Sequence, residues 1–79
     1  MRRRMAIVGD VIRYKTLGGI FSGKVVEKHS DYITLELNAP REPYYHELMT
    51  GYTKQDMMKD HINRRGDYEI LKYAGEDNG

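Results

Sequence analysis

The sequence predicts a mainly β domain, small enough that its sheet should curl into a partly open barrel. The first observation is length, because 79 residues with 39% hydrophobic content allow one compact core. The second is a series of three β-rich segments between residues 11 and 37, separated by turn residues. The third is a Tyr-rich segment at residues 67–73, which would close the sheet and protect its edges.

Two strands are predicted before residue 30. Residues 11–15 (VIRYK) follow the turn-forming pair Gly9-Asp10 and are rich in β-branched and aromatic side chains. Residues 21–29 (FSGKVVEKH) follow a second glycine pair, and Gly23 marks a bulge or a close approach of strands within them.

The clearest strand is residues 32–37 (YITLEL), which follow a Ser-Asp turn. Ile33, Leu35 and Leu37 alternate with Tyr32, Thr34 and Glu36. Strict alternation indicates one buried and one solvated face, as in an antiparallel meander. We therefore expect this strand to form a hairpin with the strand before it.

The chain after residue 37 is less regular. Pro40 and Pro43 interrupt strand pairing, so a long connection should begin there. Thr53 and Asp56 have the spacing of a capping box, which predicts a short helix or helical turn near residues 53–63, a distorted strand being the alternative. Residues 67–73 (DYEILKY) predict the closing strand.

These elements together predict an SH3-like barrel. The segment VGDVIRYKTLGGIFSGKVVEKHSDYITLELNAP, residues 8–40, resembles a KOW-type segment. More narrowly, it resembles the opening of the YkvS-like family, and INRRGDYEILK, residues 62–72, resembles the ending of that family, so the resemblance spans roughly residues 7–72. That family comprises small uncharacterised proteins of Gram-positive bacteria and their phages. The KOW-type resemblance implies nucleic-acid binding.

The charge distribution suggests three regions. The net charge is +1, with a basic N-terminal arm at residues 1–6, one barrel domain at residues 7–73 and a tail at residues 74–79 that we expect to be disordered. Arg2, Arg3 and Arg4 of the arm either contact phosphates or form a solvated terminus. The absence of Cys and of any long apolar run predicts a cytoplasmic protein with no membrane partner.

The sequence offers little support for catalysis. Gly18 and the pair Gly23-Lys24 nearly match a phosphate-binding loop, but Val25 stands where that loop needs a hydroxyl, and strand-forming residues follow. The histidines, His29, His46 and His61, would hold a metal only if they converged with Asp60, and scattered surface histidines are far commoner. We expect no catalytic residues, no cofactor, no metal and no enzymatic activity.

Binding is therefore the favoured function, and the chain carries seven tyrosines. The first hypothesis is nucleic-acid binding by a basic and aromatic outer face of the sheet, made of Arg13, Lys15, Lys24, Lys28 and Tyr32.

The alternative is a protein-interaction or regulatory module that uses the irregular stretch at residues 40–53, with Tyr44, Tyr45 and Tyr52. That stretch forms either a binding loop or a lid over the barrel. Met49, Met57 and Met58 are expected to fill the core, although adaptable Met surfaces also mark interfaces. The protein would be a monomer or a weak homodimer, since a marginal barrel gains stability by dimerising.

Overall fold

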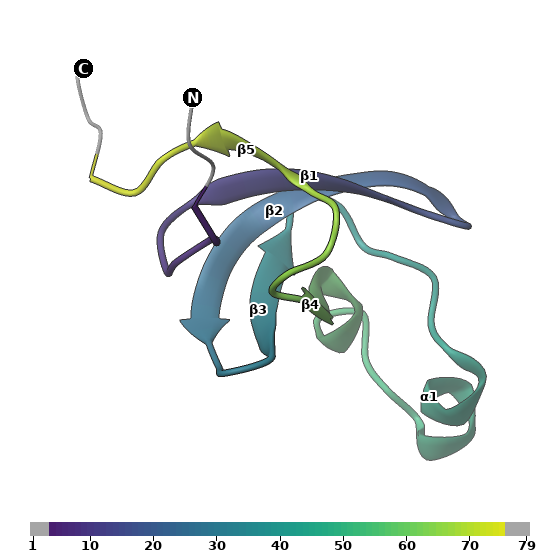
Figure 1. The fold of residues 1–79 in the computed structure, drawn as a ribbon. Helices are drawn as coiled ribbons and strands as arrows, with labels where there is room; N and C mark the ends of the chain where they lie inside the picture. The colour runs from purple at the N-terminus through teal and green to yellow at the C-terminus, as the bar shows by residue number, and fades with distance from the viewer. Residues whose placement is uncertain (1–3, 76–79) are drawn as a thin grey trace.

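A computed structural model describes residues 4–75, and these form one five-stranded antiparallel sheet in the order β4-β3-β2-β1-β5. The sheet bends strongly but does not close, because β4 and β5 remain at its two edges (Figure 1). The mainly β class and the partly open architecture are thus confirmed. The strands are β1 Val11–Thr16, β2 Gly19–Lys28, β3 Tyr32–Leu37, β4 Lys59–Asn63 and β5 Glu69–Lys72.

Glycines shape the β1–β2 hairpin. Gly19 has φ +126°, a conformation that L side chains rarely adopt, at the point where β2 begins. Gly23 lies so close to β3 that a Cβ atom there would be 2.5 Å from the carbonyl oxygen of Glu36. Lys24 pairs with Val11 of β1 and with Glu36 of β3, so the residues after Gly23 form a strand and begin no helix.

The core lies on the concave side of the sheet. Ile12, Val25, Ile33 and Leu35 are completely buried, and Tyr14, Leu37, Tyr68 and Ala6 complete the cluster. Full burial of an aliphatic side chain of this size contributes roughly 1.5–3 kcal/mol to stability. The buried face predicted for β3 is confirmed, because Ile33, Leu35 and Leu37 all belong to this core, but the predicted solvated face is wrong at Thr34, which is buried as well.

The two ends of the described chain pack together. The Ala6 N–H donates to the Tyr68 hydroxyl at 2.9 Å, and the Ala74 N–H donates to Asp10 Oδ1 at 2.6 Å. Arg4 forms a bidentate ion pair with Asp10, at 2.8 and 3.0 Å. Burial alone would raise the pKa of Asp10, but the hydrogen bonds from Arg4, Ala74 and Ile7 hold it below its ordinary value. The remaining residues of the predicted arm and tail, Arg2, Arg3 and residues 76–79, lie outside the described residues.

The stretch at residues 53–63 combines a helical turn with a strand. Thr53 and Asp56 form the predicted cap, with the Thr53 N–H donating to Asp56 Oδ2 at 2.9 Å, but the helical part is only the 3-10 turn Asp56–Met58. Residues 59–63 then form β4, because pairing with the free edge of β3 satisfies the backbone groups of both strands. Asp60 and Ile62 point inward in this strand, and Lys59, His61 and Asn63 point outward.

Residues 38–58 form an excursion between β3 and β4 that contains the helix α1, Tyr45–Thr50. The prediction of an irregular stretch is therefore wrong for these six residues. Figure 1 shows α1 at the lower right, away from the sheet. No helix of the described residues is long and apolar enough to cross a membrane.

Candidate functional site

A buried polar network joins the excursion to the sheet. Arg41 lies with Glu47 in a bidentate ion pair, with both nitrogen–oxygen distances at 2.7 Å, and its Nε donates to the carbonyl oxygen of Lys59 at 2.7 Å. Glu47 Oε1 also accepts the Tyr44 N–H at 2.9 Å, which fixes the first turn of α1. Arg41 and Glu47 are both buried. The helix is thus attached to the domain by charge-assisted hydrogen bonds, which are stronger than neutral ones.

Asp60 of β4 lies at the centre of the network. Its Oδ2 accepts a hydrogen bond from the Tyr14 hydroxyl at 2.6 Å, and its Oδ1 accepts one from the Tyr44 hydroxyl at 3.2 Å. Arg41 Nε is 3.9 Å from Oδ1, and the Arg41 guanidinium stacks on the Tyr44 ring at 4.5 Å from the centroid. Strand β1, strand β4 and the excursion therefore meet at this one carboxylate.

The protonation equilibria follow from these contacts. The hydrogen bonds from Arg41 lower the pKa of Glu47 to about 2, and the same pairing raises the pKa of Arg41. Burial, followed by the hydrogen bond to Asp60, raises the pKa of Tyr14, and burial and Asp60 likewise raise the pKa of Tyr44. The ion pair stays charged and both hydroxyls stay protonated at neutral pH.

A cavity of about 610 Å³ opens beside this network. It lies between the end of the β1–β2 hairpin and the start of the excursion. Its apolar walls come from Leu17, Phe21, Pro40 and Pro43, and its polar groups come from Arg41, Glu42, Tyr44 and Asp60. Pockets that bind ligands combine these features, an apolar lining with a few convergent polar groups.

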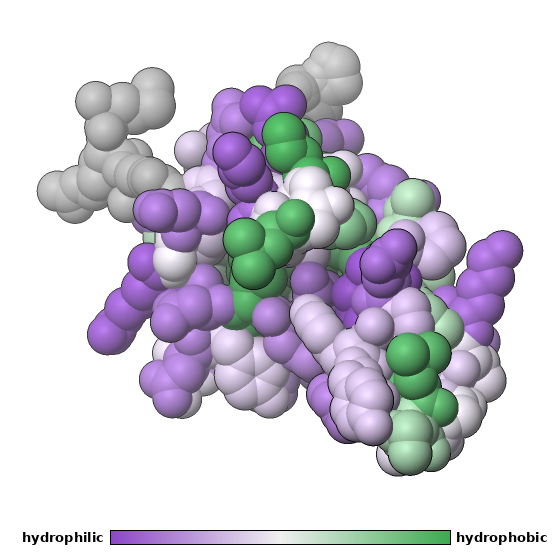
Figure 2. Space-filling model, turned by 90° about the vertical axis from the view of Figure 1, so that its right-hand side faces the viewer, coloured by the Kyte–Doolittle hydropathy of each residue, from purple (hydrophilic) through white to green (hydrophobic). Residues whose placement is uncertain are grey.

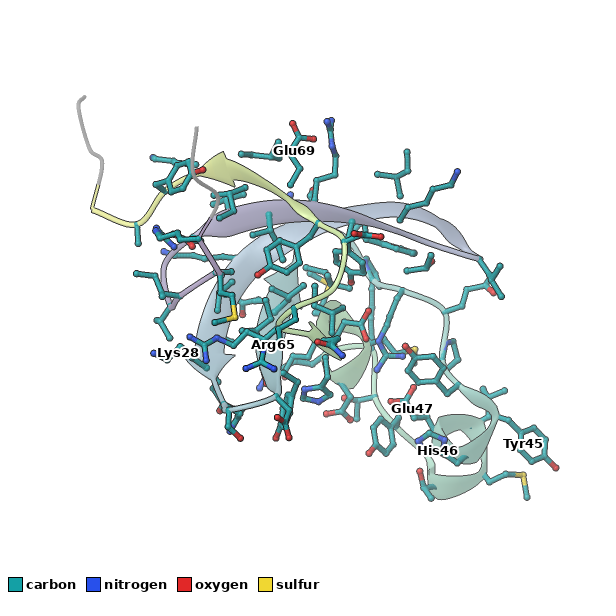
Figure 3. All side chains as sticks on the ribbon, in the orientation of Figure 1. Lys28, Tyr45, His46, Glu47, Arg65 and Glu69 are labelled. Atoms are coloured by element: carbon teal, nitrogen blue, oxygen red, sulfur yellow. The ribbon has the colours of Figure 1, made fainter. Side chains whose placement is uncertain are left out.

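The helix α1 buries a charged side chain and exposes apolar ones. Its one buried residue is the charged Glu47, whereas Tyr45, Leu48 and Met49 are 77%, 63% and 71% exposed. Tyr52, just after the helix, is 44% exposed. Figure 3 shows Glu47 directed toward the sheet and Tyr45 directed away from it, and Figure 2 shows apolar side chains on the lobe at the lower right. Met49 does not fill the core, so that expectation is wrong for this residue.

The tyrosines predicted for a protein interface all lie on the excursion. Tyr45 on α1 and Tyr52 just after it are exposed, and Tyr44 lines the cavity with its hydroxyl bound to Asp60. The Tyr44 ring also stacks on His46, with the centroids 6.0 Å apart. The structure therefore brings this predicted group together.

The residues predicted for nucleic-acid binding are only partly brought together. Arg13, Lys15 and Lys24 share the outer face of β1 and β2, as their pairing register requires. Acidic side chains interrupt this face, because Arg13 forms an ion pair with Glu69 and Lys24 is paired across the sheet with Glu36.

The other two members of that group lie elsewhere. After a bulge in β2, Lys28 pairs with Ile33 of β3. Because Ile33 and Tyr32 are neighbours on one strand and lie on opposite faces, Lys28 lies on the opposite face from Tyr32. Tyr32 is exposed at the far end of β3, where its ring stacks on His29 at 4.3 Å and meets His61 edge-on at 5.6 Å. His61 is in turn hydrogen-bonded to Thr34 at 3.0 Å. Across residues 4–75, no three His, Asp or Glu side chains gather as a group that could hold a metal.

Sequence reasoning missed the residues that build the cavity. Arg41 and Glu47 carry no motif, and their pairing depends on the path of the irregular segment around Pro40 and Pro43 and on the helix after it. The sequence suggests Asp60 only as a conditional metal ligand, although its alternation with Ile62 is a signal of a half-buried strand. Comparisons with models of known families, with curated proteins and with solved structures find no match for this chain.

Proposed function

We propose that this protein is a small, non-enzymatic binding module that holds a segment of a partner protein in the cavity between the β1–β2 hairpin and the excursion. The observation that carries the proposal is the exposure of Tyr45, Leu48 and Met49 on a helix that is fixed in place by a buried ion pair. These three side chains do not line the cavity themselves, but Tyr44, the residue that caps the start of the helix, does. Exposed apolar side chains of this kind are typical of interaction sites.

The lining of the cavity determines the chemistry of the partner segment. Arg41 is the only cation of the lining, and Glu47 already pairs with it. Glu42 and Asp60 contribute carboxylates in addition. An apolar segment that also carries a Lys or Arg would complement both the walls and the excess negative charge.

The fold is consistent with this role. A last strand that lies beside the first supports the SH3-like interpretation, and the interpretation of residues 7–72 as YkvS-like stays a proposal of the same kind. Nucleic-acid binding through Arg13, Lys15 and Lys24 stays a prediction as well. It is the weaker one, because Glu36 and Glu69 lie among these side chains.

The proposal is tested by chemical-shift titration of the ¹⁵N-labelled protein with two sets of synthetic peptides. Both sets contain aromatic and aliphatic residues, and they differ only in carrying Lys or Glu beside them. We expect the Lys set to shift amides at Leu17, Phe21 and Tyr44, and the Glu set to bind at least roughly tenfold more weakly because of the acidic lining.

Exposed residues supply the matched variants. Leu17→Ser changes the cavity rim and should weaken binding, whereas Leu71→Ser changes an exposed residue of β5 and should not. Equal binding by both variants, or shifts confined to other surfaces, contradicts the proposal. Sedimentation gives a further outcome: if the protein dimerises and the same amides shift with its own concentration, the occupant is a second copy and the partner proposal fails.

A further inference from the structure

A second cavity, of about 280 Å³, shares no lining residue with the first. Three arginines, Arg4, Arg64 and Arg65, line it together with a single carboxylate, that of Asp67. Asp10 pairs with Arg4, so the lining keeps one uncompensated positive formal charge once Asp67 is also counted. The residues come from the N-terminal segment and from the turn between β4 and β5.

Arg64 is held rigidly at this cavity. Its N–H donates to the carbonyl oxygen of Asp31 at 2.9 Å, and its own carbonyl oxygen accepts a hydrogen bond from the Tyr68 hydroxyl at 2.7 Å. Tyr68 is itself fixed by the Ala6 N–H. The backbone of Arg64 is therefore fixed on both sides before any ligand arrives.

The Arg64 side chain has a donor without an acceptor. Its Nε is buried and has no hydrogen-bond partner within the part of the chain that the structure describes. A buried donor of a charged group is costly to leave unsatisfied, and such a group in a native protein calls for a missing acceptor. Nε itself has almost no exposed surface, so an oxyanion in the cavity meets the terminal nitrogens of the guanidinium, whose N–H groups form a fork that fits two oxygens.

Further cations lie near this donor. The N–H of Arg65 is held by Asn63 Oδ1 at 2.8 Å, and its side chain is exposed. Figure 3 shows Arg65 and Lys28 at the same end of the sheet, where the β2–β3 hairpin turns. Arg4 is kept at the cavity by Asp10, and its guanidinium lies 4.8 Å from the centre of the Tyr73 ring.

We propose that this cavity binds a phosphate-class oxyanion, with Arg64 as the main donor and Arg65 as a second cation. Free phosphate, a phosphate monoester and the phosphodiester of a nucleic acid all present this chemistry. The two cavities share no lining residue, so this proposal does not depend on the outcome of the peptide experiment.

The test is a titration of the full ¹⁵N-labelled chain with sodium phosphate, compared with sodium chloride at equal ionic strength. We expect saturable shifts of the amides from Arg64 to Tyr68 in phosphate only, with a dissociation constant in the millimolar range. A parallel titration with a single-stranded oligonucleotide identifies the source. Tighter binding at the same amides assigns the site to nucleic acid, and weaker or absent binding assigns it to free phosphate or a small ester.

Three charge-removing variants complete the test. Arg64→Gln and Arg65→Gln should each weaken phosphate binding by roughly tenfold or more, since a hydrogen bond to a charged group is lost. Lys54→Gln, which removes an exposed cation of the excursion, should leave binding unchanged. Equal shifts in phosphate and chloride overturn the proposal. So does wild-type affinity in Arg65→Gln, which decides the question even if Arg64→Gln fails to fold.

Discussion

Replacing Tyr14 with phenylalanine perturbs the network around Asp60 while leaving the aromatic ring in the core. The Tyr14 hydroxyl donates to Asp60 Oδ2 at 2.6 Å, and the two residues are only 5% and 6% exposed. A hydrogen bond to a charged group contributes roughly 1.5–3 kcal/mol, and its loss leaves a buried oxygen without a partner. We therefore expect Tyr14→Phe to lower the free energy of unfolding by roughly 2 kcal/mol. In a domain of this size that lowers the Tm by roughly 8–16 °C.

The assay is urea and thermal denaturation followed by far-ultraviolet circular dichroism. Tyr45→Phe is the matched control, because its side chain is largely exposed, and it should change stability by less than about 0.5 kcal/mol. The loss of stability in Tyr44→Phe should lie between those of Tyr14→Phe and Tyr45→Phe, because the Tyr44 hydroxyl lies 3.2 Å from Asp60 Oδ1 and the residue is half exposed. If Tyr14→Phe is no less stable than Tyr45→Phe, the reasoning about Asp60 is refuted.

Three further results are expected. Because the folded pKa of Glu47 is about 2, below its ordinary 4.5, the carboxylate stabilises the native state above about pH 4.5 and this contribution is lost as the pH falls toward 2. Glu47→Gln should flatten that part of the profile of Tm against pH, and an unchanged profile would contradict the pairing. Gly23→Ala should cost about 1–3 kcal/mol in urea denaturation, because its Cβ would meet the Glu36 carbonyl oxygen; an unaltered midpoint would rule out the close approach. Leu48→Ser and Met49→Ser should shift stability by less than about 0.5 kcal/mol, whereas a large loss by calorimetry would show that they pack inward.

The strands β1, β2, β3 and β5 could be predicted because their signals are local. Alternation and turn residues such as Gly19 specify them without knowledge of their neighbours. The signal in residues 59–63 is ambiguous, because Asp60 and Ile62 alternate as in a strand, whereas the spacing of Met58 and Ile62 also fits a helix. The free edge of β3 decides between the two by offering hydrogen-bond partners, and that information lies about 25 residues earlier in the chain.

The sequence indicates Tyr44, Tyr45 and Tyr52 but not the orientation of the helix that carries the site. In most short helices the apolar side chains face the core, whereas here the charged Glu47 does. The pattern of residues 45–50 suggests that Leu48 and Met49 should pack inward, since burying apolar area is what normally stabilises a short helix. In the structure a charged partner, Arg41, is already fixed at the sheet by the Lys59 carbonyl oxygen, so Glu47 turns inward.

A buried ion pair of this kind contributes little net stability compared with apolar packing, but it sets orientation, because removing either partner leaves a buried charge. The helix is thus positioned by Glu47, while Tyr45, Leu48 and Met49 remain exposed. Apolar side chains are exposed elsewhere as well, Leu17, Ile20 and Leu71 among them, so exposure alone does not distinguish this helix. Tyr45, Leu48 and Met49 differ in lying on one short helix that a buried ion pair holds in place, and this supports the proposal that a partner covers them. It is also the reason for placing the proposed binding role at the excursion ahead of the basic face of the sheet.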